Sequence, residues 1–178
     1  MNFYARGFNL YLLLIAVSLM ATCGCQSEQT KQAKHLSALR IHVENRAQLI
    51  GSGETISVLR SNPVLVTINI EPMLTEANVI GAALLDTPGG MAVEIKLDEI
   101  GTFTLEQYTS AYIGKHLAIF GQWNEKAADS RWLAAPIITH RIANGELSFT
   151  PDCSLEEAKQ FVLGLNNMAK KLDQEKSK

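Results

Sequence analysis

The stretch from Met91 to Trp123 constrains the fold most, because its pattern predicts a strand, a helix and a second strand in direct succession. Apolar and polar side chains alternate over residues 91–98, as they do in a strand with one buried face. Gly101 breaks this alternation. The hydroxyl of Thr104, followed three residues later by Gln107, then has the pattern of a capping box at the start of a helix.

The helix predicted after this cap has one apolar side and ends at Gly114, which is a suitable C′ residue. The stripe consists of Leu105, Tyr108, Thr109, Tyr112 and Ile113. Leu117–Phe120 follows as an apolar run of strand length. The whole unit predicts a fold and contains no motif for a chemical reaction.

Length and charge narrow the class of protein. The chain has 178 residues, enough for one domain and an appendage. It carries 16 basic and 18 acidic residues, a net charge of −2, and shows no basic stripe. A nucleic-acid partner is therefore not expected, because phosphate binding needs such a stripe. Residues 173–178 are interpreted as a charged, solvated tail.

Residues 1–25 have the pattern of a bacterial export signal. Arg6 supplies a basic start, and Leu10–Ala21 is an apolar run interrupted only by Ser18. A bilayer-spanning helix needs about 20 apolar residues. The run is shorter than that, so a removable signal is favoured over a permanent membrane span.

Two cysteines refine this prediction. The segment Leu19–Cys25 resembles the lipobox of bacterial lipoproteins, in which a cysteine after small residues is acylated and becomes the first residue of the mature chain. Cys25 is the favoured acylation site because Gly24 precedes it, and Cys23 is the alternative. A secreted protein without lipid is the other interpretation. A zinc or redox site at these cysteines is not expected, because no second ligand pair has suitable spacing.

The resemblance to lipoproteins implies fatty acylation, such as palmitate, and a place in the cell envelope facing the periplasm. Gln26 after the favoured cysteine gives a hint towards the outer rather than the inner membrane. Residues 26–36 are interpreted as a polar tether between the lipid and the domain.

Between the tether and Met91, alternating apolar residues predict four strands. They are Leu39–Val43, Thr55–Leu59, Val64–Ile70 and Val79–Leu85. We expect the first two to form an added hairpin region over residues 37–63. Leu74–Asp86 is ambiguous, because Thr75 is also a possible cap for a short helix. The turn residues 86–90 favour a hairpin between Val79–Leu85 and residues 91–98.

After Trp123, a polar loop at 124–130 leads to apolar residues on both sides of Pro136. We interpret Arg131–Ile142 as one bent or edge strand. A short strand is expected from Leu147, and Ser154 with Glu157 forms a second capping box. The helix that follows has the longest apolar stripe in the chain. The stripe consists of Leu155, Ala158, Phe161, Val162, Leu165, Met168, Ala169 and Leu172. These elements predict an α+β fold, a mostly antiparallel sheet with two main amphipathic helices packed on one face.

A series of landmarks then recurs in the order of a known family. They are Pro72–Thr75, Val93–Asp98, Gly101, Thr109, Ile113–Lys115, Leu117–Ile119, Ala135–Ile137, Ile142, Gly145 and Ser154 with Glu156–Ala158. Residues 64–172 resemble the head subdomain of the first periplasmic domain of SecD, an accessory subunit of the bacterial protein-export translocase. The resemblance implies a head-type α+β module, which in SecD faces emerging polypeptide outside the membrane. The transmembrane segments of SecD have no counterpart here, so proton-driven movement is not expected.

No catalytic, cofactor or metal site is predicted from the polar residues. The four histidines, His35, His42, His116 and His140, lie in separate predicted elements. Cys153 is interpreted as a small apolar residue before the last helix, because no activating base is implied beside it.

Arg131 and Trp132 are the candidate partner contact, because an exposed tryptophan beside an arginine is typical of interaction hot spots. The favoured alternative is that Trp132 packs under the sheet while Arg131 caps its edge. The leading functional hypothesis is a non-enzymatic envelope lipoprotein that binds a protein or peptide in connection with export, without a small-molecule substrate. The alternatives are a scaffold lipoprotein with one fixed protein partner and no role in translocation, and an envelope enzyme.

Overall fold

The computed structural model describes residues 35–45, 53–124 and 129–177, which belong to one compact unit, His35–Lys178. The predicted export signal, Cys23, Cys25 and most of the predicted tether lie outside the described residues. Among the helices that are described, none combines the length and the apolar character that crossing a bilayer requires.

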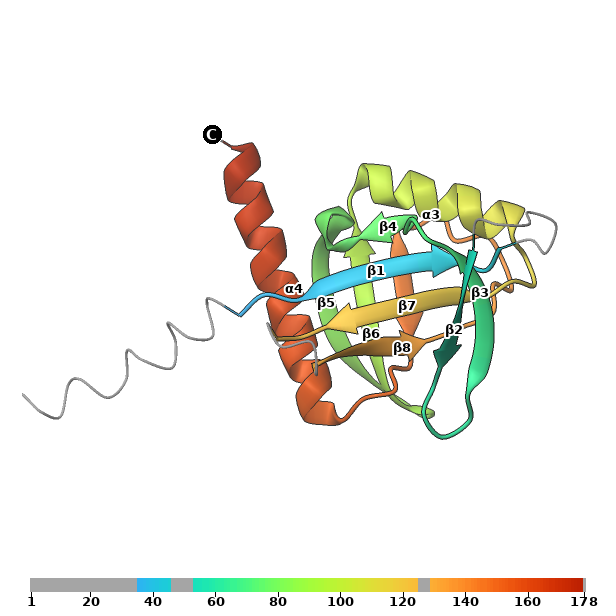
Figure 1. The fold of residues 1–178 in the computed structure, drawn as a ribbon. Coiled ribbons are helices and arrows are strands. Elements are labelled where there is room, and N and C mark those ends of the chain that lie inside the picture. Colours follow the sequence, from blue (N-terminus) through green and yellow to red (C-terminus); the bar gives the residue numbers. More distant parts are fainter. Residues whose placement is uncertain (1–34, 46–52, 125–128, 178) are drawn as a thin grey trace, which may run out of the picture. The chain divides into compact units, whose positions relative to one another are not determined.

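A four-stranded antiparallel sheet forms one layer of this unit (Figure 1). Its order is β4 (Leu74–Thr75), β1 (Ala38–Val43), β7 (Leu117–Gln122) and β8 (Ser130–Ala134). β1 pairs with β7 over its full length, with Ala38 opposite Gln122 and Val43 opposite Leu117. The predicted strands 39–43 and 117–120 therefore both exist and are direct neighbours.

A three-stranded antiparallel sheet forms the second layer, in the order β5 (Val79–Thr87), β6 (Gly90–Leu97) and β9 (Glu146–Phe149). β5 and β6 are joined by the two-residue turn Pro88–Gly89, which confirms the predicted hairpin. Thr75 also caps a short 3-10 helix, η1 (Glu76–Asn78), so both interpretations of Leu74–Asp86 are partly right.

The remaining strands, β2 (Gly53–Val58) and β3 (Val64–Asn69), pair only with each other among the named strands, as an antiparallel hairpin. The predicted pairing of Thr55–Leu59 with Leu39–Val43 is therefore wrong. The correct partner of β2 is the next strand along the chain, because Val58 opposite Val64 closes a short turn. Leu59 in this turn has a positive φ of 70°, which is uncommon for a residue with a branched side chain.

The first main helix, α3 (Glu99–Ala111), begins six residues before the predicted start. Its N-cap is Asp98, whose carboxylate accepts a 2.7 Å hydrogen bond from the Gly101 backbone N–H, so the predicted cap at Thr104 is wrong. Thr104 instead donates to the Ile100 carbonyl inside the helix. Gly101 lies in the first turn of this helix. A Cβ at this position would lie 3.0 Å from Asn78 Cβ, so a glycine here allows the helix to approach Asn78 closely.

The segment after Pro136 is not a strand, which corrects the prediction for residues 137–142. Ile137 forms one isolated bridge with His116. The Ile138 backbone N–H then donates to the Lys115 carbonyl, and the Ile142 N–H donates to the Thr109 hydroxyl. The chain therefore follows the C-terminal end of α3, where side-chain and loop acceptors replace a strand partner.

The last helix, α4 (Leu155–Lys176), has the predicted capping box of Ser154 and Glu157. It lies against β5 and also contacts β1 and β6. Phe161 and Leu165 are buried, but Leu155 is 55% exposed because it precedes the part of the helix that reaches the sheets. α4 continues to Lys176, so most of the predicted tail is helical.

Two apolar cores result from this arrangement. The larger core lies between the two sheets and the helices and includes Ile41, Ile95, Leu105, Ile119 and Phe161. A smaller core lies between the β2–β3 hairpin and the outer face of the four-stranded sheet. It consists of Ile56, Val58, Val66, Ile68 and Ala118. The prediction of an α+β fold with mostly antiparallel strands and two main helices is confirmed, with the strands divided over three sheets.

Candidate functional site

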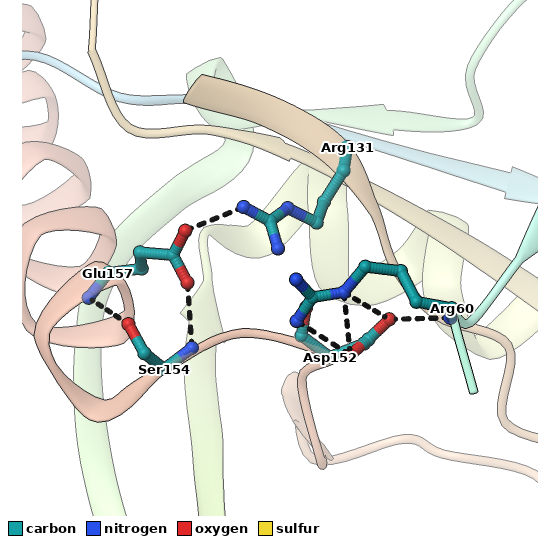
Figure 2. Close-up of polar contacts among 5 residues, drawn as sticks. All are labelled: Arg60, Arg131, Asp152, Ser154 and Glu157. Atoms are coloured by element: carbon teal, nitrogen blue, oxygen red, sulfur yellow. Dashed lines mark hydrogen bonds and ion pairs between the residues drawn. The ribbon is translucent and has the colours of Figure 1, made fainter. Parts of the chain in front are cut away.

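The two residues predicted as a partner contact point to opposite faces of β8. Arg131 faces the larger core, where its Nη2 donates to Glu157 Oε1 at 2.6 Å (Figure 2). Its guanidinium also lies 4.7 Å from the Trp123 ring centroid. The pKa of Glu157 is lowered, first by the hydrogen bond from the Ser154 backbone N–H and also by Arg131. Arg131 is only 22% exposed and links β8 to the start of α4.

Trp132 lies on the other face, with His42 of β1 and Phe120 of β7. Its ring centroid is 5.4 Å from each of the other two rings, and both pairs are edge-to-face. Phe120 is the cross-strand neighbour of Trp132, and the exposed Arg40 is the cross-strand neighbour of Phe120. We call His42, Phe120 and Trp132 the aromatic surface. The structure therefore does not bring Arg131 and Trp132 together as one contact.

His42 connects the aromatic surface to the hairpin. Its Nδ1–H donates to the Asn69 carbonyl at the end of β3, at 2.8 Å. Burial lowers the pKa of His42 below its ordinary value of 6.5. A neutral imidazole suits this position, because the Asn69 carbonyl needs one donor and Trp132 packs against the ring. No local pattern in the sequence predicts this role, because Asn69 lies 27 residues further along the chain and the contact depends on where the hairpin lies.

A second link to the hairpin is polar. The Arg60 backbone N–H and guanidinium both donate to the Asp152 carboxylate, at 2.8 Å and 3.1 Å (Figure 2). These bonds lower the pKa of Asp152. The neighbouring Cys153 is half-buried, and burial raises the pKa of its thiol to about 11. A thiol that stays protonated at neutral pH is a poor nucleophile.

The remaining ionisable cluster joins β1 to the start of β7. Glu44 accepts hydrogen bonds from Lys115 Nζ at 2.9 Å and from His116 Nδ1 at 2.7 Å. Burial by itself raises the pKa of Glu44, but the His116 and Lys115 bonds outweigh it and lower the value to about 2. Across the described residues, no three His, Cys, Asp or Glu side chains gather as metal ligands would. The polar residues thus connect elements of the fold.

The strand edges differ in how they are covered. The edge of β5 faces α4, where the Asn166 amide bonds both backbone groups of Ala82, accepting from its N–H and donating to its carbonyl, each at 2.9 Å. The Asp152 backbone N–H donates to the Leu133 carbonyl of β8. In contrast, β2 is an edge strand whose residues Thr55 and Ser57 are exposed. The aromatic surface and the edge of β2 are the candidate site.

Comparison with known proteins gives one family. The family model described as "SecDF, P1 head subdomain" matches residues 53–169. The match begins at residue 53, whereas the sequence landmarks predicted a start at 64. No curated protein matches the chain by sequence.

Two solved structures have the same fold. One is described as "Structure and function of a membrane component SecDF that enhances protein export". Its TM-score is 0.53 at 21% identity, over 80% of this chain and 69% of the other. The second is described as "Crystal structure of SecDF in Super-membrane-facing form". Its TM-score is 0.57 at 22% identity, over 80% of this chain and 21% of the other, so the chain spans about a fifth of that protein.

Proposed function

This chain belongs to the SecDF P1 head subdomain family, and from that membership we propose that it is a non-enzymatic module that binds polypeptide in connection with protein export. The family match over residues 53–169 is the observation that carries the proposal. One structural neighbour is a SecDF described as enhancing protein export, and a head-type module with the same fold is suited to contact an exported polypeptide.

The candidate site supports polypeptide as the ligand. Phe120 and Trp132 are half-buried aromatic side chains on the outer face of a sheet. Their rigid apolar area is suited to contact apolar side chains of polypeptides with different sequences. The open edge of β2 offers backbone hydrogen bonds. Together these features favour a ligand recognised by its backbone and by apolar side chains.

We also propose a lipid anchor at Cys25, with Cys23 as the alternative, which holds the domain at the periplasmic side of the cell envelope, with the outer membrane favoured. The described chain starts at His35, whose Nε2 and carbonyl contact Gln160 and Asn167 of α4. β1 then runs from α4 to the hairpin (Figure 1). Mass spectrometry of the mature N-terminus tests the anchor, and a processed chain without an acyl group contradicts it.

A fixed-partner scaffold remains the second candidate, because another surface fits it. Ile100 and Phe103 are 71% and 60% exposed on α3 and line a shallow depression of about 500 Å³ together with Glu99, Thr102 and Glu106. An apolar pair with acidic neighbours is suited to a partner with apolar and basic side chains.

Site-specific photo-crosslinking in intact cells separates the two candidates. A benzophenone side chain is placed at Phe120 or at Phe103 of the full-length chain, and pulse-labelled newly exported proteins are followed. The proposed function predicts many transient crosslinked products from position 120. A single stable product from position 103 and none from 120 favours the scaffold and contradicts polypeptide binding in export.

A further inference from the structure

We infer that the outer edge of β2 receives an extended polypeptide segment as an added β-strand, with the aromatic surface taking one of its side chains. The inference rests on the proposed function, because it names where on this chain the polypeptide binds. It deepens that function by giving a recognition mode, in which the backbone of the ligand provides most of the contact.

The orientation of the β2 backbone follows from a hydrogen bond on the far side of β3. The Asn45 backbone N–H donates to the Thr67 carbonyl at 2.7 Å, so the backbone carbonyl of Thr67 points away from β2. Thr55 is directly opposite Thr67. In an antiparallel pair, two opposite residues either bond each other through their backbone N–H and carbonyl groups or both point these groups away from each other. Thr55 and Ser57, two residues apart, therefore point their N–H and carbonyl groups outward. The 3.0 Å contact between the Thr55 and Thr67 hydroxyls agrees, because side chains lie closer in non-hydrogen-bonded pairs.

These outward groups lack a partner in the part of the chain that the structure describes. The backbone hydrogen bonds outside helices and strand pairs include none from Thr55 or Ser57. Both side chains are exposed. β2 also lacks the usual protection of an edge strand, since it contains no lysine and no proline.

Three other strand edges have a hydrogen-bond partner from another segment of the fold. Asn166 bonds both backbone groups of Ala82 on β5, Asp152 bonds Leu133 on β8, and Asn45 bonds Thr67 on β3. In each case one residue from another segment occupies the edge. The fold therefore closes these three edges with its own chain and leaves the outer side of β2 without such a residue among those described.

The aromatic surface lies beside β2. β2 contacts β8, and Trp132 of β8 packs against the smaller core that contains Ile56 and Val58 of β2. A row of outward N–H and carbonyl groups at strand spacing, about 6.8 Å for every second residue, is matched by an extended polypeptide backbone. Charge imposes little selection, because Glu54 on the strand and Arg40 beside Phe120 have opposite signs. The ligand class is thus an extended segment with aromatic or β-branched residues at alternate positions.

The test replaces single backbone donors. In the full-length acylated chain in detergent, Thr55→Pro and Ser57→Pro each remove one outward N–H without touching the β2–β3 ladder, and proline is tolerated at such edge positions. Thr55→Ala and Ser57→Ala are the matched controls, which change the side chain and keep the N–H. The probe is a fluorescent synthetic peptide of alternating threonine with valine and phenylalanine, followed by anisotropy. Each proline weakens binding by roughly two- to tenfold, and the alanine variants stay within about twofold of the parent.

The outcomes separate the inference from the proposed function. If the parent binds and the proline variants bind equally well, the inference is overturned while polypeptide binding stands. If the parent does not bind the peptide, the inference is also overturned, and the crosslinking in cells decides the proposed function alone. If sedimentation shows a dimer that the proline variants abolish, the edge belongs to a second copy and the inference is overturned.

A cysteine variant keeps the test valid if the proline variants do not fold. Ser57→Cys is mixed with peptides that carry one cysteine at successive positions. Strand addition predicts disulfide formation at alternate peptide positions, because successive side chains of a strand point to opposite faces. Equal crosslinking at every position overturns the inference.

Discussion

The edges of β5 and β2 differ in whether another segment of the described chain bonds their outward backbone groups. An unpaired strand edge exposes backbone N–H and carbonyl groups that can pair with another chain. On β5 the Asn166 amide reproduces both bonds of a missing strand at Ala82, and α4 covers the edge. On β2, Thr55 and Ser57 keep their outward groups exposed.

The difference follows from what each region must bury. α4 carries a long apolar stripe and must lie against the sheets, so it brings Asn166 to β5 as a consequence of core packing. The hairpin buries only the inner face of β2 in a small core. Burial of apolar area therefore determines which edge is closed, and the outer edge of β2 has no such partner among the described residues.

The largest effect is expected where the closed region is packed most tightly. Phe161 is 1% exposed in the larger core, and a Cβ on Gly121 would lie 3.0 Å from its ring. Phe161→Ala should lower the free energy of unfolding by about 3–5 kcal/mol, because it removes a large buried side chain and leaves a cavity. Urea unfolding measures this. Leu155→Ala on the same helix is the control and should change it by less than about 0.5 kcal/mol, because Leu155 is exposed. Equal losses would contradict the packing described.

Asn166 gives the next effect, because its amide bonds the backbone at the β5 edge. Asn166→Ala leaves the N–H and carbonyl of Ala82 without partners, which should lower the free energy of unfolding by about 1–3 kcal/mol. α4 still covers this edge, so the variant should not gain binding of the extended fluorescent peptide when Thr55→Pro is also present. Gln174→Ala, on the exposed end of α4, is the control for the helix. Unchanged stability would mean that the Asn166 amide does not stabilise the β5 edge.

A smaller effect on stability is expected when the pH is lowered, through His42 beside the β2–β3 hairpin. Because burial lowers the folded-state pKa of His42, the neutral form is favoured in the folded protein. The unfolded state binds the proton more readily, so stability is full above about pH 6.5 and falls as the pH drops below it. Trp132 fluorescence should report loosening of the hairpin in this range. His42→Gln should remove the pH dependence, whereas His140→Gln on the exposed loop should keep it. A transition that persists in His42→Gln would assign it to another group.

Local patterns predicted the elements, and long-range contacts determined the rest. Alternation identified β6, a short apolar run identified β7, and the Ser154–Glu157 box located the start of α4, because each signal lies within a few residues. The pairing of β1 with β7 could not be found this way, since Ala38 and Gln122 are distant in sequence. The cap of α3 was predicted at Thr104 but lies six residues earlier at Asp98, where the first turn packs Gly101 closely on Asn78.

The candidate site was partly accessible from the sequence. Trp132 was identified together with Arg131, and the structure places their side chains on opposite faces of β8. Successive residues of a strand point to opposite faces, so adjacent side chains on β8 cannot share one contact surface. The residues that do lie beside Trp132, His42 and Phe120, come from other strands, and their proximity depends on the sheet order.

The smallest effect should come from the ion pair that ties the hairpin to the start of α4. Asp152→Ala removes bonds to both the backbone N–H and the guanidinium of Arg60, whereas Arg60→Ala keeps the backbone bond. Hydrogen exchange of the β2 and β3 amides should therefore speed up more in Asp152→Ala than in Arg60→Ala, with α4 amides beyond its first turn unchanged in both. High salt should reduce the difference from the parent in Arg60→Ala, because the Arg60 side chain is 65% exposed and its pair is screened. Equal exchange in both variants would show that the backbone bond to Asp152 adds nothing measurable, and that the Arg60 guanidinium alone ties the hairpin to this segment.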